Sequence, residues 1–362
     1  VECHYKEKHM EIEDMENIWI LADTWIELEA FDRSVPWYEN VLCFVREQLG
    51  EEHLLYADAL VEYTKYFEAV RDYMAGEKFY QQAIKIYHEK KMEYSEKGRA
   101  VLVQRAIAYQ IQSKFAEALQ IYQDLLTYQS GKYGENYYGN AELYSNIGTL
   151  FGQQGNFSKE LSQYKKALEI LEIAGKQGSC LVHIHQNICV AYLESGNGKE
   201  AWKYIKKAKR IVEDVYGKNS IHLITIYNNM SGVWSVRDRS DKALEYLQKA
   251  ELLIKQSHME NSEAASYIYW NMGVLLDKNG YMRDATAFLR DSIKIQKKIF
   301  GEQSEQIAKS YEQLAYNLHK TSNHKEAKYY INKARAVYSS LYGSQNEHIK
   351  RIDDYLKSLQ SH

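Results

Sequence analysis

Proline, paired cysteines and long apolar runs are nearly absent from this chain of 362 residues. Pro36 is the single proline, and because proline breaks helix interiors, its scarcity permits long uninterrupted helices. The four cysteines form no C-x-x-C pair, the spacing typical of zinc and thiol-redox motifs. No stretch is long and apolar enough to span a bilayer, and no signal peptide is visible. We therefore expect a cytoplasmic protein in which Cys189 is a buried free thiol.

Motifs that carry catalysis are missing as well. The sequence has no G-x-S-x-G, H-E-x-x-H or P-loop string. His183 and His185 are two residues apart on an expected helix, which points them to different faces and argues against a shared metal. Carboxylates such as Glu62 and Glu68 are scattered, as surface carboxylates on helices usually are. We expect no catalytic residue, no cofactor and no metal, and hence no enzyme.

Charge gives little indication of a partner. The formal net charge is −3, so no bulk electrostatic attraction to nucleic acid or to a membrane is implied. A basic run does occur within one expected helix, and we interpret it as a solvated face. It comprises Lys203, Lys206, Lys207, Lys209 and Arg210.

The sequence does contain a regular repeat. Glycines expected to close helices recur at a nearly constant step of 42 residues, with one step of 41. Each is predicted to form a left-handed C-terminal cap. A repeat of this length indicates a solenoid, in which each unit buries its apolar face against its neighbours. The series is Gly50, Gly134, Gly175, Gly217, Gly301 and Gly343, with Met92 and Met259 at the two remaining positions.

Small and large residues keep fixed offsets within each unit. From Asn146, the residues Gly148, Phe151, Tyr164 and Ala167 follow, and the same frame recurs along the chain. This spacing predicts two antiparallel helices per unit, with small residues where the helices cross. Glycine- and asparagine-rich turns, such as residues 154–156 and 195–198, separate the paired helices.

The predicted fold is all-α, a right-handed superhelical solenoid in one continuous array. Residues 1–13 form a polar N-terminal leader, and residues 14–344 hold about eight helix pairs. Residues 345–362 supply a C-terminal capping helix, with Ile349, Ile352 and Tyr355 on one face. A terminal helix with a polar outer side is the cap that a solenoid needs for solubility.

This pattern resembles the tetratricopeptide repeat. That family's consensus has small residues at the eighth and twentieth positions and an aromatic residue near the eleventh. Its usual unit has about 34 residues, so the helices here are each roughly a turn longer. The resemblance implies that the first helix of each pair lines a concave groove.

One position of that groove is occupied by amides in consecutive units. An amide offers an acceptor and two donors, so it can pair with a peptide backbone whatever the peptide's side chains. Four stacked first helices span about 30 Å, which matches an extended ligand of roughly 5–9 residues. Alternatively, the amides bond to neighbouring helices and set the superhelical pitch, and both uses can coexist. The amides are Asn146, Asn187, Asn229 and Asn271, flanked by Gln104 and Gln313.

Other groove candidates follow from the same frame. Asn228, Tyr267 and Trp270 are expected to face inward beside the amides. Lys65 and Arg71 are placed at the N-terminal end, where a cation can take a ligand carboxylate. All eleven residues are therefore predicted to bind peptide.

Several strings are similar to the peptide-pheromone receptors of the Rap, NprR and PlcR quorum-sensing group, and most closely to NprR. They are the aromatic N-terminal unit at residues 18–25 and the segments 134–138 and 141–148. The resemblance implies that a short signalling peptide switches the oligomeric state of a bacterial transcription regulator. It also implies a possible peptide-free role in binding a sporulation phosphorelay response regulator. Such regulators contact DNA through a helix-turn-helix domain before the repeats, which this chain lacks, and its start at Val1 fits removal of that domain.

Two rival functions remain open. One is a static scaffold resembling kinesin light chain repeats, and the other is a Rap-like accessory that promotes dephosphorylation of a partner. The Rap catalytic glutamine motif has no convincing match here. The 32 tyrosines exceed what the repeat positions need, and surplus surface tyrosine favours interfaces, so we expect a homo-oligomer of at least two subunits.

Overall fold

The computed structural model describes residues 14–27, 31–176, 178–343 and 346–360. These residues form 17 α-helices and contain no β-strand. The prediction of an all-α fold built from eight helix pairs and a final helix is confirmed. The predicted leader, residues 1–13, lies outside the described residues. Within the described part of the chain, no helix combines the length and the apolar character that crossing a bilayer requires.

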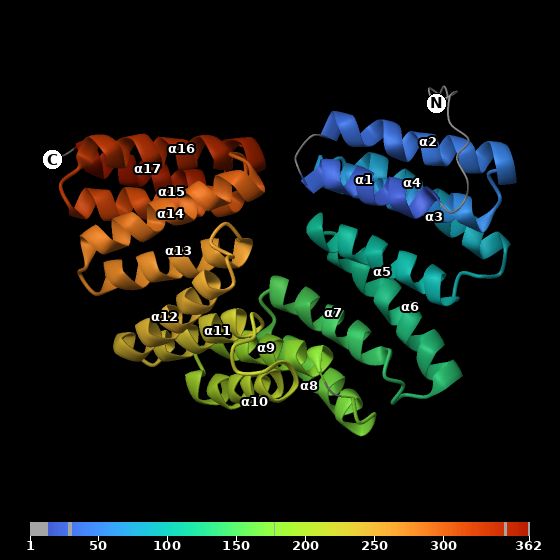
Figure 1. Cartoon of the computed structure of the whole chain (residues 1–362), viewed down its shortest axis with the longest axis horizontal. Helices are drawn as coiled ribbons and strands as arrows, with labels where there is room; N and C mark the ends of the chain where they lie inside the picture. Colours follow the sequence, from blue (N-terminus) through green and yellow to red (C-terminus); the bar gives the residue numbers. More distant parts are fainter. Residues whose placement is uncertain (1–13, 28–30, 177, 344–345, 361–362) are drawn as a thin grey trace. The chain divides into compact units, whose positions relative to one another are not determined.

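The first of two compact units, Val1–Ala174, contains four helix pairs. Within each pair the two helices pack against each other, and successive pairs follow in chain order (Figure 1). The helices are α1 (Met15–Glu27), α2 (Phe31–Leu49), α3 (Leu54–Ala69), α4 (Tyr73–Glu89), α5 (Glu96–Ile111), α6 (Phe115–Tyr133), α7 (Asn140–Gln153) and α8 (Phe157–Ile173).

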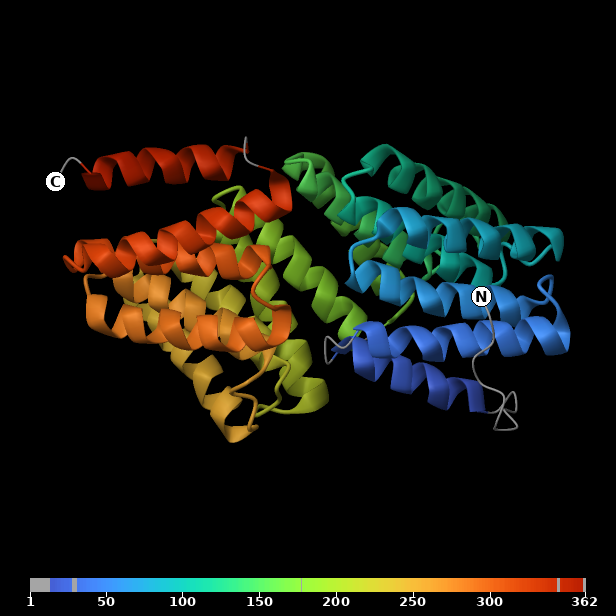
Figure 2. The same ribbon diagram turned by 90° about the horizontal axis from the view of Figure 1, so that it is seen from above.

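The second unit, Gly175–His362, contains the other four pairs and the final helix. The final helix packs against α16 and buries Ile349 and Ile352, and its red ribbon ends beside the C-terminus in Figure 2. The helices are α9 (Ser179–Glu194), α10 (Gly198–Tyr216), α11 (Leu223–Val236), α12 (Ser240–Gln256), α13 (Glu263–Lys278), α14 (Met282–Phe300), α15 (Glu305–Lys320), α16 (His324–Tyr342) and α17 (Glu347–Gln360).

Small residues bring the two helices of a pair close together, as the repeat frame predicts. A Cβ atom on Gly148 of α7 would lie 2.7 Å from the Tyr164 ring of α8. A Cβ atom on Gly273 of α13 would lie 2.6 Å from Leu289 of α14. Since real Cβ contacts are longer than this, each helix crossing depends on the missing side chain.

Polar contacts between first helices join residues about one repeat apart. In the N-terminal unit, Lys65 of α3 binds Asp23 of α1 at 2.8 Å. In the C-terminal unit, the amides of Asn228 and Asn271 are 43 positions apart and 2.7 Å from each other. Equivalent helices of neighbouring repeats therefore lie side by side, and the sequence period becomes a spatial period.

The second helices end in two different ways. Those of 19 residues, such as α6 and α10, end at a glycine with φ near 90° and ψ near 160°. The prediction of positive φ is confirmed at Gly134 and Gly217, but ψ differs from that of a left-handed cap. This extended region is essentially restricted to glycine.

The second helices of 17 residues, α4, α8 and α12, end instead with positive φ one residue beyond the C-cap. That residue is Lys91 (φ 58°), Gly175 (φ 62°) or His258 (φ 54°). Gly175 therefore aligns with Lys91 and His258, not with the other glycines. Met92 and Met259 are tolerated because the backbone at these ends accepts ordinary side chains.

Candidate functional site

The amide position lies on the first helix of every pair in the C-terminal unit. Asn187 lies on α9, Asn229 on α11, Asn271 on α13 and Gln313 on α15, and all four side chains are half-buried. The four residues are spaced by 42 positions because the helices repeat at that step. One amide per repeat is thus presented at the same place on each first helix.

Neighbouring first helices are linked by polar side chains in this region. Asn271 donates its Nδ2 to Asn228 Oδ1 at 2.7 Å, which joins α13 to α11. Gln186 of α9 donates to the Thr225 hydroxyl of α11 at 3.1 Å. The alternative interpretation, in which the row amides bond to neighbouring helices, therefore describes Asn271, which bonds to Asn228 of α11. It also describes Gln313, which bonds to Asp277 of α13.

Asp277 is the centre of the largest of these links. Its carboxylate is buried on α13 and accepts hydrogen bonds from Gln313 at 3.2 Å and from Asn317 at 3.1 Å, both on α15. Lys320 adds an ion pair at 2.8 Å. A buried carboxylate is tolerated only when it is paired and hydrogen-bonded, so this cluster holds α13 and α15 in one register.

Asn317 was missed by the sequence interpretation. It is fully buried one helical turn after Gln313, and its Oδ1 accepts the Thr286 hydroxyl of α14 at 2.5 Å. The available signal was its position four residues after Gln313, which places both amides on one face of α15. The network could not be inferred from that spacing because Asp277 and Thr286 come from other helices.

Donors and acceptors for a ligand remain in this network. Asn228 accepts one bond at Oδ1, and Asn271 contributes one of its two N–H groups. An amide carries two donors and a two-lone-pair acceptor, so both residues keep capacity for a peptide backbone. Among the described residues, no hydrogen bond reaches the Asn229 side chain. Asn229 is therefore a candidate amide whose side-chain donors and acceptor stay free within the described part of the chain.

Tyr267 and Trp270, also predicted for the groove, have different surroundings. Trp270 packs against the apolar cluster of α14 to α17, and its buried indole N–H has no partner among the described residues. Tyr267 is exposed, with its ring beside Phe300. Burial and the charge of Glu263 raise the pKa of Tyr267, so its hydroxyl remains a hydrogen-bond donor at neutral pH.

The remaining predicted residues belong to the N-terminal unit. Gln104 is exposed on α5, and Asn146 is half-buried on α7. Lys65 of α3 is bound to both Asp23 and Glu62 at 2.8 and 2.5 Å. Arg71 is exposed in the turn between α3 and α4, with a positive φ of 61°.

The two histidines were predicted to lie on different faces of one helix, and Cys189 was predicted to be buried. His183 is exposed and His185 is buried, so the two residues do lie on different faces of α9. Burial, with a smaller contribution from Lys207, lowers the pKa of His185 to about 4. Cys189 is a buried free thiol whose pKa is raised to about 12 by burial. In the described part of the chain, no cluster of three or more His, Cys, Asp or Glu residues is arranged to hold a metal ion.

Known proteins share parts of this arrangement. The tetratricopeptide repeat family model matches residues 99–173, which run from within α5 to the end of α8. A curated relative, kinesin light chain-related protein 3 of Arabidopsis thaliana, is 20% identical over 195 residues. That match covers 53% of this chain and 30% of the plant protein, so the chain spans under a third of its relative.

Two solved structures match over most of the chain. The apo form of the quorum sensor NprR from B. thuringiensis is 17% identical, with a TM-score of 0.50, over 90% of this chain and 99% of NprR. A Rap protein complexed with Competence and Sporulation Factor is 12% identical, with a TM-score of 0.55, over 96% and 98% of the two chains. At sequence identities this low, the two matches show likeness of fold alone. The chain is thus built from tetratricopeptide-type helix pairs, in a fold that it shares with NprR and Rap proteins.

Proposed function

We propose that the first-helix face of the C-terminal unit, formed by α9, α11, α13 and α15, binds a short extended peptide. The observation that carries this proposal is the row of half-buried amides, Asn187, Asn229, Asn271 and Gln313, one on each helix. Amides recognise a peptide backbone through both donors and acceptors, which allows binding with little dependence on ligand side chains.

The number of helices sets the ligand length. First helices packed at about 10 Å give a row of about 30 Å, and an extended chain advances about 3.3 Å per residue. The ligand would therefore have roughly 5–9 residues. A peptide that bridges several helices favours whichever arrangement of repeats it binds more tightly, and this differential affinity supplies a switch.

The regulatory setting is proposed from the fold. The likeness to NprR, described as a quorum sensor, and to a Rap protein bound to Competence and Sporulation Factor supports a cytoplasmic peptide-sensing domain of a transcription regulator. In this proposal the peptide changes the oligomeric state, and the peptide-free form binds a sporulation response regulator. DNA contact would need a separate helix-turn-helix domain.

A static scaffold is the second candidate. It is favoured by the similarity to a kinesin light chain-related protein and by the amide link between Asn228 and Asn271, which also has a structural use. A Rap-like accessory would instead release phosphate from a phosphorylated partner. The proposed receptor performs no catalysis. A phosphorylated response regulator should therefore lose its phosphate at the same rate with and without this chain.

The proposal is tested with an immobilised array of random octapeptides probed by the fluorescently labelled chain. We expect sequences that bind in the micromolar range and are released by the same octapeptide in solution. A matched array of octapeptides with N-methylated backbones should not bind, because N-methylation removes the N–H donors that the amides would pair with. An array without binders, or equal binding of the N-methylated set, would contradict the proposal.

A further inference from the structure

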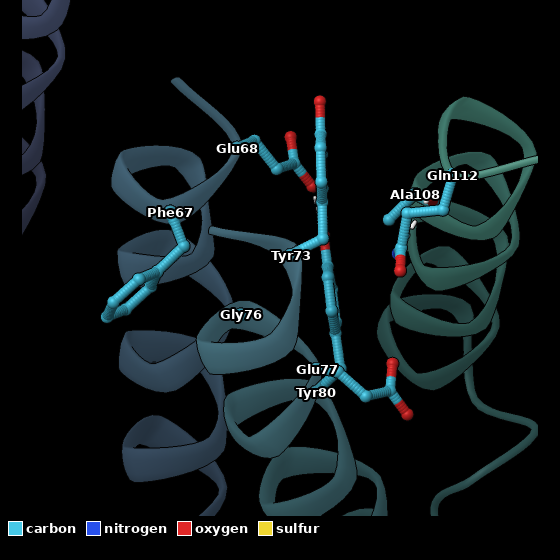
Figure 3. A pocket seen from close by; sticks show the side chains of 8 residues that line it. All are labelled: Phe67, Glu68, Tyr73, Gly76, Glu77, Tyr80, Ala108 and Gln112. Carbon is cyan, nitrogen blue, oxygen red and sulfur yellow. Dashed lines mark hydrogen bonds between the residues drawn. The ribbon is translucent and has the colours of Figure 1, made fainter. Parts of the chain in front are cut away.

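A concave pocket lies between α3, α4 and α5 of the N-terminal unit (Figure 3). It lies outside the amide row, which belongs to the other unit. Residue 76 is glycine, and a Cβ atom there would lie 3.2 Å from Phe67 Cβ, so the glycine lets α4 approach α3. The lining residues are Phe67 and Glu68 of α3, Tyr73, Gly76, Glu77 and Tyr80 of α4, and Ala108 and Gln112 at the end of α5.

The polar groups of the pocket are mainly acceptors. The Glu68 carboxylate accepts one hydrogen bond, from the Tyr80 hydroxyl at 2.8 Å. The Glu77 carboxylate accepts bonds from Arg105 and from Tyr109, the latter at 2.8 Å. Burial alone raises the pKa of Glu77, but the bonds from Arg105 and Tyr109 outweigh it, and the net effect lowers the pKa so that the group stays ionised.

Two helix ends add to the negative potential. Helix α3 ends at Ala69, one residue after Glu68, and Gln112 is the C-cap of α5. The C-terminal end of a helix carries a partial negative charge, which favours cations nearby. The carboxylates and the helix C-termini thus both make the electrostatic potential in the pocket more negative.

Aromatic rings form one wall. Figure 3 shows the rings of Tyr73 and Tyr80 edge-on, with Ala108 and Gln112 opposite them and the Glu77 side chain extending toward α5. The face of a tyrosine ring attracts a cation placed over it. A cationic group in this space would meet a ring face and a carboxylate together.

The chain uses the same combination next to the pocket. The Arg105 guanidinium binds Glu77 and lies 5.1 Å over the Tyr109 ring. Glu77 is therefore already neutralised, and Glu68 is the lining carboxylate without an ion pair among the described residues. Arg71, exposed in the turn, is also nearby, and its charge acts on Tyr73. Lys114 lies 5.5 Å over the Tyr109 ring beside Arg105.

We propose that this pocket binds the cationic end of a lysine or arginine side chain presented by a partner protein or peptide. Glu68 supplies the charge and accepts the N–H donors, while Tyr73 supplies a ring face. Tyr80 is buried and orients the Glu68 carboxylate through its hydroxyl. A neutral or acidic side chain of the same size would gain neither interaction.

The test uses Nα-acetyl-arginine amide and Nα-acetyl-lysine amide as probes, with Nα-acetyl-glutamine amide as the uncharged comparison. Ligand-observed saturation-transfer NMR on the full chain measures their dissociation constants. We expect millimolar binding of both basic probes and at least tenfold weaker binding of the glutamine probe. Equal binding of all three would overturn the proposal.

Two variants locate the site. Glu68→Gln keeps an acceptor for Tyr80 but removes the charge, and should weaken binding of the basic probes by at least threefold. Glu96→Gln, an exposed carboxylate at the opposite end of α5, is the matched control and should change nothing. If Glu68→Gln unfolds, Tyr73→Leu replaces it, with the same expected loss. If the folded variant, Glu68→Gln or Tyr73→Leu, bound the basic probes as the parent chain does, the proposed site would be wrong. This conclusion does not depend on the outcome of the octapeptide array.

Discussion

At the scale of the residue, the candidate amides differ in whether they bond to a neighbouring helix. Asn271 donates to Asn228 and so joins α13 to α11. Asn229, adjacent in sequence to Asn228, has no such partner among the described residues. Asn271 and Asn228 therefore join helices, and we propose the ligand role for Asn229.

Replacing Asn229 with alanine tests the ligand role. Loss of the amide should strand a desolvated peptide group and weaken binding of an array-selected octapeptide by about 1–3 kcal/mol. Helix content should stay unchanged, because the side chain bonds to no described residue. Isothermal titration calorimetry measures the affinity, and circular dichroism measures the helix content.

The matched control is Asn332→Ala. Asn332 is exposed on α16 and donates to the Lys328 carbonyl at 2.7 Å, so its loss removes an amide away from the first helices. Binding of the octapeptide should match that of the parent chain. If Asn229→Ala also matched the parent, the amide row would have only a structural use.

His185 makes stability depend on pH. Its pKa is lowered to about 4 from the ordinary value of 6.5, so the unfolded chain binds a proton at higher pH than the folded chain does. The contribution of neutral His185 to the free energy of unfolding is therefore fully present above pH 6.5. It is lost as the pH falls toward 4, by at most about 3 kcal/mol. His185→Phe should remove this loss, whereas His183→Gln, an exposed neighbour, should retain it. Urea denaturation at pH 7.5 and pH 4.5 measures the difference, and equal acid sensitivity of parent and His185→Phe would contradict it.

At the scale of the element, helix length and helix end are coupled. The 19-residue second helices use a glycine-only conformation, whereas the 17-residue ones use a conformation that Lys91 and His258 also adopt. These backbone angles explain why glycine recurs at most repeat ends and is absent at two of them.

Two glycine substitutions separate these ends. Gly217→Ala places a side chain in the glycine-only backbone region and should lower the free energy of unfolding by about 2–3 kcal/mol. Gly175→Ala occupies the position of Lys91 and His258 and should cost about 1 kcal/mol. Nothing lies within 4 Å of a Cβ atom at either glycine, so the difference reports the backbone alone. Thermal unfolding of both variants measures the loss of unfolding free energy. Equal losses would refute the distinction between the two kinds of helix end.

The repeat frame was readable from the sequence because each position recurs eight times. Small residues such as Gly148 and Gly273, the paired helices and the capping helix all follow from it. The contacts of Asp277 with Asn317 and Lys320 were not readable, because one carboxylate on α13 meets α15 only after the repeats stack. The ion pair of Lys65 with Asp23 of α1 was hidden for the same reason, although Lys65 was expected to meet a ligand. Its pair with Glu62, three residues earlier on α3, is one that helical spacing allows.

At the scale of the whole molecule, exposed tyrosines mark the repeat ends. Tyr133, Tyr216 and Tyr342 each precede a cap glycine and are 43%, 44% and 48% exposed. Exposed tyrosine favours protein interfaces. Together with the proposed peptide switch, this predicts at least a dimer whose subunit count or shape depends on peptide.

Light scattering with and without an array-selected octapeptide measures this. The mass or the hydrodynamic radius should change at peptide concentrations above the dissociation constant. A monomer under both conditions would exclude the switch and leave a passive binding module. Glu68→Gln should give the same masses as the parent, since its pocket lies outside the amide row.

The most direct test of peptide binding at the amide row is hydrogen exchange followed by mass spectrometry, with and without an array-selected octapeptide. We expect slower exchange in α9, α11, α13 and α15, with the second helices α10, α12, α14 and α16 changed less. Protection confined to the second helices, or no protection at saturating octapeptide, would contradict binding at the first-helix face.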